Sequence, residues 1–83
     1  MSHSDAVRDY CGNAYVAPAR AAGRSEIKIR AGDVHKALGY SNRMPLVCSA
    51  IGSKKFEDQF GAKRTSIEGP SASTTTTYTF RLS

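Results

Sequence analysis

Apolar side chains recur at intervals of three and four along much of the chain, which is the period of one helix face. Over residues 5–12 this spacing predicts a first helix, which Ser4 or Asp5 can cap. A Gly-Asn pair then weakens or ends it. A second short helix is expected over residues 18–22, because proline is tolerated at a first helical position. Residues 1–3 are expected to be disordered.

Two further helices and a short helical turn are predicted in the middle of the chain. The first covers residues 31–38, and Gly39 ends it because glycine readily adopts the left-handed conformation of a helix stop. The second covers residues 42–51, with Asn42 as its cap. One or two more turns lie within residues 53–61. The inward face of the second helix is expected to carry Met44, Val47, Cys48 and Ile51.

Polar and apolar residues alternate in three other segments, which indicates strands with one buried face. Residues 26–30 form a short charged strand suited to a sheet edge, with Ile27 and Ile29 inward. Residues 63–68 and 74–82 are expected to pair as a hairpin around a polar loop. The inward side chains of this hairpin are expected to be Thr65, Ile67, Tyr78, Phe80 and Leu82.

Together these elements predict a small α+β domain over residues 4–83. It has a helical segment over 4–23, a helix-turn-helix core over 26–61 and a hairpin over 63–82. Three or four short helices therefore accompany the hairpin and a short edge strand. A chain of 83 residues holds one domain, because domains usually contain about 100–150 residues.

Composition restricts the class of protein further. Apolar residues make up 40% of the chain, which is enough for a core and excludes a wholly disordered chain. No apolar run approaches the roughly 18 residues that span a bilayer, so no membrane partner is expected. The two cysteines, Cys11 and Cys48, predict reduced thiols in a cytoplasmic protein, because small secreted domains usually carry about four to eight.

Groups able to perform catalysis or bind a metal are few. A tetrahedral zinc site would need both cysteines to converge with His3 and His35, and no pair of them has the spacing of a zinc finger. Cys48 is expected to point inward, and His35 to be a packed or surface side chain, so the two do not suggest a nucleophile and its base. The sequence therefore predicts no catalytic residue, no cofactor and no metal.

The order strand, helix, short turn, helix and hairpin is that of a winged helix. Residues 27–82 resemble the winged-helix (winged helix-turn-helix) superfamily of nucleic-acid-binding domains in element order, in the break at 39–42 and in the final hairpin. The resemblance implies that the second helix of the pair is presented to duplex DNA and that the hairpin flanks it as a wing. Residues 30–35 and 42–48 also look like a stretch shared by small uncharacterised bacterial proteins, a likeness that carries no known activity.

A helix that enters the major groove needs small polar groups and cations on its outward face. The positions opposite the predicted buried face are Asn42, Leu46, Ser49 and Ser53. Ser49 is small enough to let the helix approach base edges, and Asn42 either pairs with an adenine edge or simply caps the helix. Leu46 is expected to be partly buried, the alternative being contact with a thymine methyl group.

Positive charge concentrates around this helix. The net charge is +5, and residues 20–64 alone hold ten basic and four acidic residues, a net charge of +6. The predicted DNA-binding residues are Asn42, Arg43, Ser49, Ser53, Lys54, Lys55, Lys63 and Arg64. Each phosphate that a cation neutralises releases counterions, so the affinity is expected to fall steeply with salt. This interpretation requires residues 43–51 to be exposed on one side, with the cations gathered near them.

The loop between the hairpin strands, residues 68–73, carries no cation. Wings that enter the minor groove usually place Arg or Lys there, so a deep minor-groove contact is not expected. The hydroxyl groups of Ser71, Ser73 and Thr74 remain candidates for phosphate contacts.

The same fold is also compatible with a protein-interaction adaptor or a homodimerising module. The hairpin or the edge strand over 26–30 would then pair with a strand of a partner or of a second copy. Tyr10, Tyr15 and Val16 are more apolar than a tail requires. They either cover the core, which we prefer because a small core needs every apolar residue, or help to dock that partner.

Overall fold

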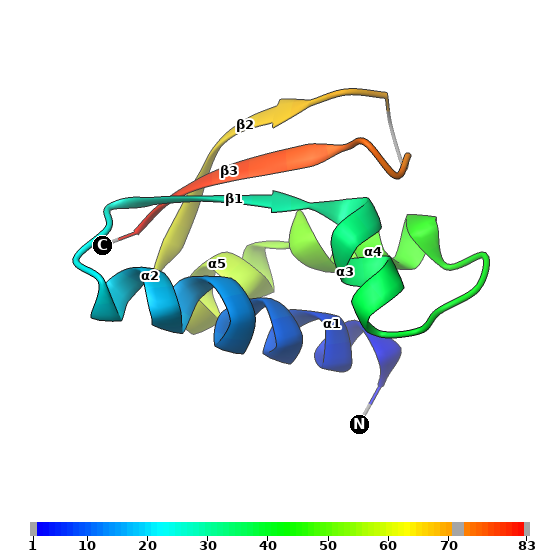
Figure 1. The fold of residues 1–83 in the computed structure, drawn as a ribbon, viewed down its shortest axis with the longest axis horizontal. Coiled ribbons are helices and arrows are strands. Elements are labelled where there is room, and N and C mark those ends of the chain that lie inside the picture. The colour runs from blue at the N-terminus through cyan, green and yellow to red at the C-terminus, as the bar shows by residue number, and fades with distance from the viewer. Residues whose placement is uncertain (1, 71–72, 83) are drawn as a thin grey trace.

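The chain folds into an antiparallel sheet with helices packed against one of its faces (Figure 1). The computed structural model describes residues 2–70 and 73–82, and over these residues the sheet has three strands in the order β1-β3-β2. The α+β class, the short edge strand and the C-terminal hairpin predicted from the sequence are confirmed. The arrangement is consistent with a small winged-helix-like domain.

A helical rod formed by the first part of the chain runs beneath the sheet. It comprises α1 (His3–Cys11), a π-helical turn η1 (Gly12–Val16) and α2 (Ala17–Ala21). The two helices predicted here are thus joined through helical backbone, and the Gly-Asn pair does not break them. The packing of the Phe60 ring requires a glycine at position 12, because a Cβ atom there would lie 2.2 Å from Cε1 of Phe60.

The rod begins earlier than the sequence predicts. The side-chain oxygen of Ser2 accepts a hydrogen bond from the backbone N–H of Asp5 at 3.1 Å, so Ser2 is the cap in place of Ser4 or Asp5. The helix therefore starts at His3, inside the segment predicted to be disordered, while Met1 lies outside the described residues.

β1 (Glu26–Arg30) has the predicted bounds, and it leads directly into α3 (Ala31–Ala37). No side chain among the described residues caps α3. Instead, the backbone N–H groups of Ala31 and Gly32 donate to the carbonyl oxygens of Thr76 at 2.9 Å and Thr74 at 3.1 Å. The loop of the hairpin thus satisfies the first amide groups of α3, which would otherwise lack partners.

The turn between the next two helices differs from the prediction. Asn42 adopts a φ of 55°, which is left-handed backbone, and it does not cap α4 (Met44–Ile51). Arg43 precedes the helix instead, and its backbone N–H donates to Nε2 of His35 at 3.1 Å. α4 therefore begins two residues later than expected, because a contact with α3 fixes its start. Gly39 ends α3 with a φ of 70°, as predicted.

α5 (Lys54–Phe60) leads into the hairpin, which consists of β2 (Ala62–Glu68) and β3 (Thr77–Leu82). β3 lies between the other two strands and buries the predicted side chains of Tyr78, Phe80 and Leu82. The third strand starts at Thr77 and not at residue 74, because Ser73 and Thr75 form a turn in which the side-chain oxygen of Ser73 accepts the Thr75 N–H at 3.0 Å.

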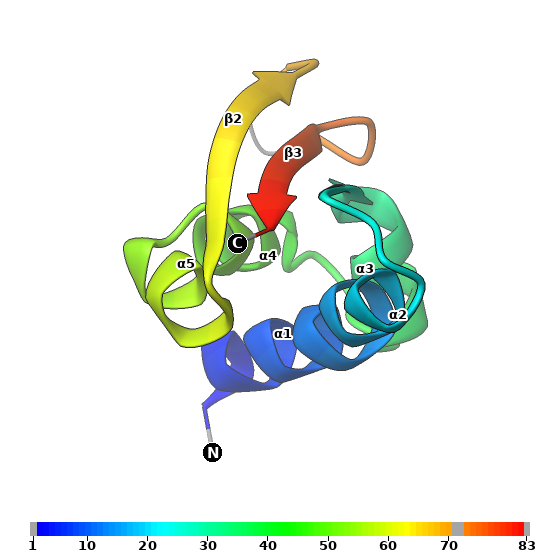
Figure 2. The ribbon, with the colours of Figure 1, turned by 90° about the vertical axis from the view of Figure 1, so that its left-hand side faces the viewer.

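β2 departs from its predicted burial. Its side chains beyond Ala62 are exposed, and 49% of the Ile67 surface is accessible. Thr65 and Ile67, predicted to point inward, are therefore not core residues. Thr65 occupies a register irregularity between Arg64 and Ser66, and the strand rises away from the helices (Figure 2).

The core lies between the sheet and the helices, and it has the composition that the apolar spacing predicts. Its largest fully buried side chains are Phe56, Phe80, Ile29, Ile51, Val7, Val34 and Val47. The apolar residues of the helical rod contribute to it, since Val16 is buried while Tyr10 and Tyr15 pack against its edge. Among the described residues, no helix is long and apolar enough to cross a membrane.

Candidate nucleic-acid interface

One side of α4 is sealed in the molecule, because the helix packs against α1 and α3. Val47, Cys48, Ala50 and Ile51 are buried, while Met44 and Leu46 are half-buried. The exposed side chains of the helix are Pro45 and Ser49, four residues apart and therefore on one face. The predicted inward face is thus largely confirmed, but the stripe left for a partner is narrower than a major-groove helix with a broad polar face would present.

An arginine from β2 lies across the end of α4. Nη1 of Arg64 donates to the carbonyl oxygen of Gly52 at 3.0 Å, and the Arg64 backbone N–H donates to Oε2 of Glu57 at 3.0 Å. These bonds join the hairpin to the α4–α5 junction. The exposed guanidinium consequently lies at the C-terminal end of α4, although Arg64 is far from this helix in the sequence.

The hairpin is also tied to α4 from within. The hydroxyl of Tyr78 donates to the carbonyl oxygen of Cys48 at 3.2 Å. Burial, followed by this hydrogen bond, raises the pKa of Tyr78 to about 12. The hydroxyl therefore stays protonated as a donor at neutral pH.

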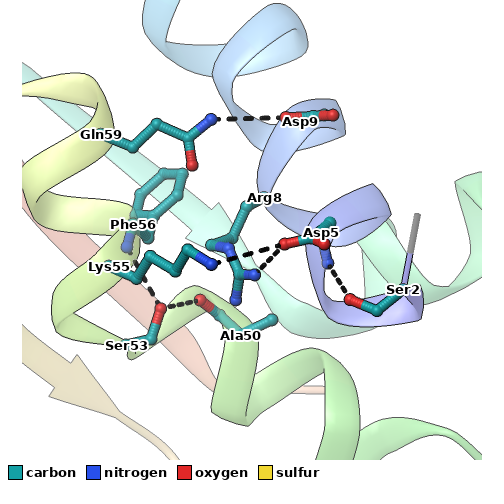
Figure 3. Close-up of polar contacts among 9 residues, drawn as sticks. All are labelled: Ser2, Asp5, Arg8, Asp9, Ala50, Ser53, Lys55, Phe56 and Gln59. Atoms are coloured by element: carbon teal, nitrogen blue, oxygen red, sulfur yellow. Dashed lines mark hydrogen bonds and ion pairs between the residues drawn. The ribbon is translucent and has the colours of Figure 1, made fainter.

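Ser53, predicted to contact DNA, is used by the fold (Figure 3). Its side-chain oxygen accepts the backbone N–H of Phe56 at 3.2 Å and donates to the carbonyl oxygen of Ala50 at 2.8 Å. It is the cap of α5, which lets the chain turn sharply between the two helices. Its hydroxyl group therefore has two partners within the protein.

Lys55 turns toward the helical rod and away from β2. Its Nζ lies 3.9 Å from Oδ1 of Asp5, and 70% of its side chain remains exposed (Figure 3). Asp5, Asp9 and Asp58 all border a shallow depression between α1 and α5 together with Lys55. This side of the molecule is acidic, so Lys55 is a poor candidate for a phosphate contact.

Arg8 is a structural residue that the sequence analysis missed. Only 7% of its surface is exposed, and it forms an ion pair with Asp5 (Figure 3). The hydrogen bond from Arg8, followed by hydrogen bonds from Ser2, lowers the pKa of Asp5. The apolar pattern predicts inward positions for apolar residues only, whereas the spacing of three between Asp5 and Arg8 is the signal in the sequence for this ion pair.

The two cations at the start of β2 lie on opposite faces of the sheet, because neighbouring strand residues alternate. Lys63 pairs with Arg81 and Arg64 with Phe80, so Lys63 belongs to the outer face. Four exposed cations occupy that outer face, accompanied by Glu26 and Glu68: Lys28, Arg30, Lys63 and Arg81. Positive charge is thus spread over more than one side, and the predicted concentration around α4 is partial.

The structure therefore divides the predicted DNA-binding residues into groups. Asn42 and Arg43 are exposed at the start of α4, and Ser49 is exposed along it. Ser53, Lys54 and Arg64 lie at or near the end of α4, whereas Lys55 and Lys63 belong to other surfaces. We call the surface that carries Arg43, Ser49, Lys54 and Arg64 the α4–β2 surface.

Most of the described hydroxyl groups in the loop of the hairpin are used within the fold. The side-chain oxygens of Ser73 and Thr75 are 2.8 Å apart, and the Thr76 hydroxyl donates to the carbonyl oxygen of Pro70. Thr74 is exposed, and Ser71 lies outside the described residues. This bonding shapes the loop, and it leaves Thr74 as the described candidate for the phosphate contact predicted here.

The cysteines are free thiols in the interior. Cys11 and Cys48 are both buried, and burial raises the pKa of Cys11 to about 12. Over residues 2–70 and 73–82, no group of three or more His, Cys, Asp or Glu side chains is placed to hold a metal ion. The ring of His35 serves the fold by accepting the Arg43 N–H.

Comparisons of the chain with protein-family models, with curated proteins and with solved structures find no match.

Proposed function

We propose that the protein binds duplex DNA through the α4–β2 surface, chiefly by contacts to phosphates. The observation that carries this proposal is the bond from Arg64 to the Gly52 carbonyl oxygen. It joins the hairpin to the end of α4, so that cations from distant parts of the chain belong to one surface. Arg43 extends that surface to the start of the helix.

The dimensions of α4 suit such a contact. An α-helix with its side chains is about 10–12 Å across, and the major groove of B-DNA is about 12 Å wide. Ser49 and Pro45 are compact, so the helix backbone can come close to the duplex along the exposed stripe. Arg43 and Lys54, near the two ends of the helix, would then reach phosphates on either side.

The burial of α4 limits sequence discrimination. Bases are distinguished by side chains that reach their edges, and Ser49 is the exposed polar side chain on this helix. Asn42 and Arg43 add a contact at its start. We therefore expect binding that tolerates many sequences, with an affinity set mainly by phosphate contacts and salt.

The test is a fluorescence anisotropy titration with a labelled duplex of mixed sequence at low salt. Non-specific binding gives dissociation constants of about 10⁻⁴–10⁻⁶ M, and we expect values in this range that weaken steeply as salt is added. The double variant Arg43→Ala/Lys54→Ala should reduce the slope of log affinity against log salt by about two ion equivalents.

The matched control is Lys28→Ala/Arg30→Ala, which removes two exposed cations from the outer face of the sheet. It should leave the slope nearly unchanged. If both double variants lower the slope equally, DNA does not select the α4–β2 surface, and the proposal fails. A chain that shows no binding at about 100 μM protein would also refute it.

A further inference from the structure

β1 offers an unpaired edge to solvent. The Leu82 N–H donates to the Ser25 carbonyl oxygen at 2.8 Å, which fixes the phase of the antiparallel ladder between β1 and β3. Because successive residues of a strand alternate, the amide and carbonyl groups of Glu26, Lys28 and Arg30 point away from β3. Within the described residues no strand pairs with this edge (Figure 2).

A groove of about 360 Å³ runs between this edge and the helical rod. Figure 1 shows the rod extending alongside β1 for much of the strand's length. The lining residues come from η1, α2, the turn that follows and β1: Ala14, Tyr15, Pro18, Ala19, Ala22, Arg24, Ile27 and Lys28. Apolar side chains thus form most of the lining, beside backbone groups that are free to bond to another strand.

The residues that line this groove carry only positive charge, and Glu26 lies beside them on the outer face of the sheet. Among the residues that the structure describes, Arg24 and Lys28 line the groove and no carboxylate does. A π-helical turn contributes Ala14 and Tyr15. Such turns are rare, and they occur frequently at functional sites. Three independent features therefore coincide here: unpaired strand groups, an apolar hollow and two cations.

We propose that an extended acidic segment of a partner protein binds here by adding a fourth strand to the sheet beside β1. Its backbone would bond to the outward amide and carbonyl groups of Glu26, Lys28 and Arg30. Its alternate side chains would enter the groove, and its carboxylates would meet Arg24 and Lys28.

The charges favour such a partner over a second copy of this chain. Antiparallel pairing of β1 with itself about Lys28 would place Glu26 of each copy opposite Arg30 of the other, but it would also place the two Lys28 side chains opposite one another at its centre, and like charges opposite each other are destabilising. It would also bring the two cationic grooves together. An acidic strand places opposite charges at the same positions.

The test uses a blocked heptapeptide of alternating valine and glutamate, titrated into the ¹⁵N-labelled protein. We expect saturable amide shifts confined to β1, η1 and α2, with a dissociation constant of about 1 mM or tighter. The same peptide with lysine in place of glutamate should produce no such shifts. An absence of shifts at about 5 mM of the glutamate peptide, or shifts centred on the α4–β2 surface, would overturn the proposal.

Two variants separate the backbone contact from the charge contact. Lys28→Pro removes the Lys28 charge together with an amide that points to the free edge while sparing the β1–β3 ladder, so Lys28→Ala is its control. The proline variant should abolish binding, whereas the alanine variant should only weaken it. Arg24→Glu/Lys28→Glu keeps the backbone and should weaken binding at least about tenfold. Lys54→Glu/Lys55→Glu, an equal change of charge on α5, should have little effect, and equal loss in both charge variants would contradict the proposal.

Sedimentation of the protein without peptide tests whether a second copy of this chain pairs with the β1 edge. We expect a monomer. A dimer whose β1 amides are protected from exchange would show that a second copy fills this edge, and it would refute the peptide proposal. The DNA titration is independent of this result, because Arg24 and Lys28 lie outside the α4–β2 surface.

Discussion

Replacement of Gly32 by alanine tests how the hairpin loop is fixed to α3. A Cβ atom at Gly32 would lie 2.4 Å from the backbone carbonyl oxygen of Thr74, well inside the 3.0 Å below which real Cβ atoms essentially never approach other atoms. The same carbonyl oxygen accepts the Gly32 N–H at 3.1 Å. The loop must therefore move by about half an ångström or more, and this hydrogen bond weakens or breaks.

Two effects of opposite sign compete in this variant. Alanine favours helix over glycine by about 1 kcal/mol, which would stabilise α3. Overpacking against backbone costs about 1–3 kcal/mol, and loss of the hydrogen bond costs about 0.5–1.5 kcal/mol more. We expect the clash to dominate and the free energy of unfolding to fall by about 1–3 kcal/mol, which lowers the Tm of a chain this size by about 5–20 °C.

Urea denaturation followed by far-UV circular dichroism measures this change, and amide shifts of Thr74–Thr76 report whether the loop has moved. Ala37→Gly is the control, because Ala37 is exposed in the same helix and reports helix propensity alone. Both variants should be less stable than the parent protein. A Gly32→Ala variant that is as stable as the parent, or more stable, would show that the loop does not press on α3.

Two further predictions concern stability. Ser53→Ala should lower the free energy of unfolding by about 0.5–2 kcal/mol, because it removes the cap of α5. The control is Ser49→Ala, at an exposed site on α4, which should change the free energy of unfolding little. Equal urea midpoints for the two variants would contradict the capping role of Ser53. Stability should also fall at high pH. Folding raises the pKa of Cys11 from 9.0 and of Tyr78 from 10.0, each to about 12. The unfolded chain therefore loses these protons first, and the stability present below pH 9.0 is lost progressively as the pH rises toward about 12. A urea midpoint that is the same at about pH 8 and about pH 11 would refute this.

The sequence pattern predicted correctly those elements that are determined by residues close to one another in the chain. β1 has the expected bounds because five alternating residues suffice to define a strand with one buried face. Gly39 was recognised as a helix stop, since it takes the left-handed conformation that glycine favours. The inward face of α4 followed from its period of three and four in the same way.

Errors arose where distant parts of the chain decide the local structure. The start of α4 is set by the bond between His35 and Arg43, which no property of Asn42 reveals. Ile67 alternates like a buried strand residue, yet β2 rises beyond the helices that would cover it. The joining of Arg64 to Gly52 likewise depends on how the hairpin folds back. For this reason, the sequence predicted candidate DNA-binding residues but could not show which of them share a surface.

The position of β3 has a consequence for how the protein is made. β3 lies in the middle of the sheet, but it follows β1, the helices and β2 in the chain. While a ribosome is still synthesising residues 77–82, β1 has no strand to pair with. The first amide groups of α3 also lack their acceptors until the carbonyl groups of Thr74 and Thr76 have been synthesised. Folding should therefore be delayed until this segment has emerged. A translation product that stops before it would leave two unpaired strands, a natural substrate for chaperones or proteases.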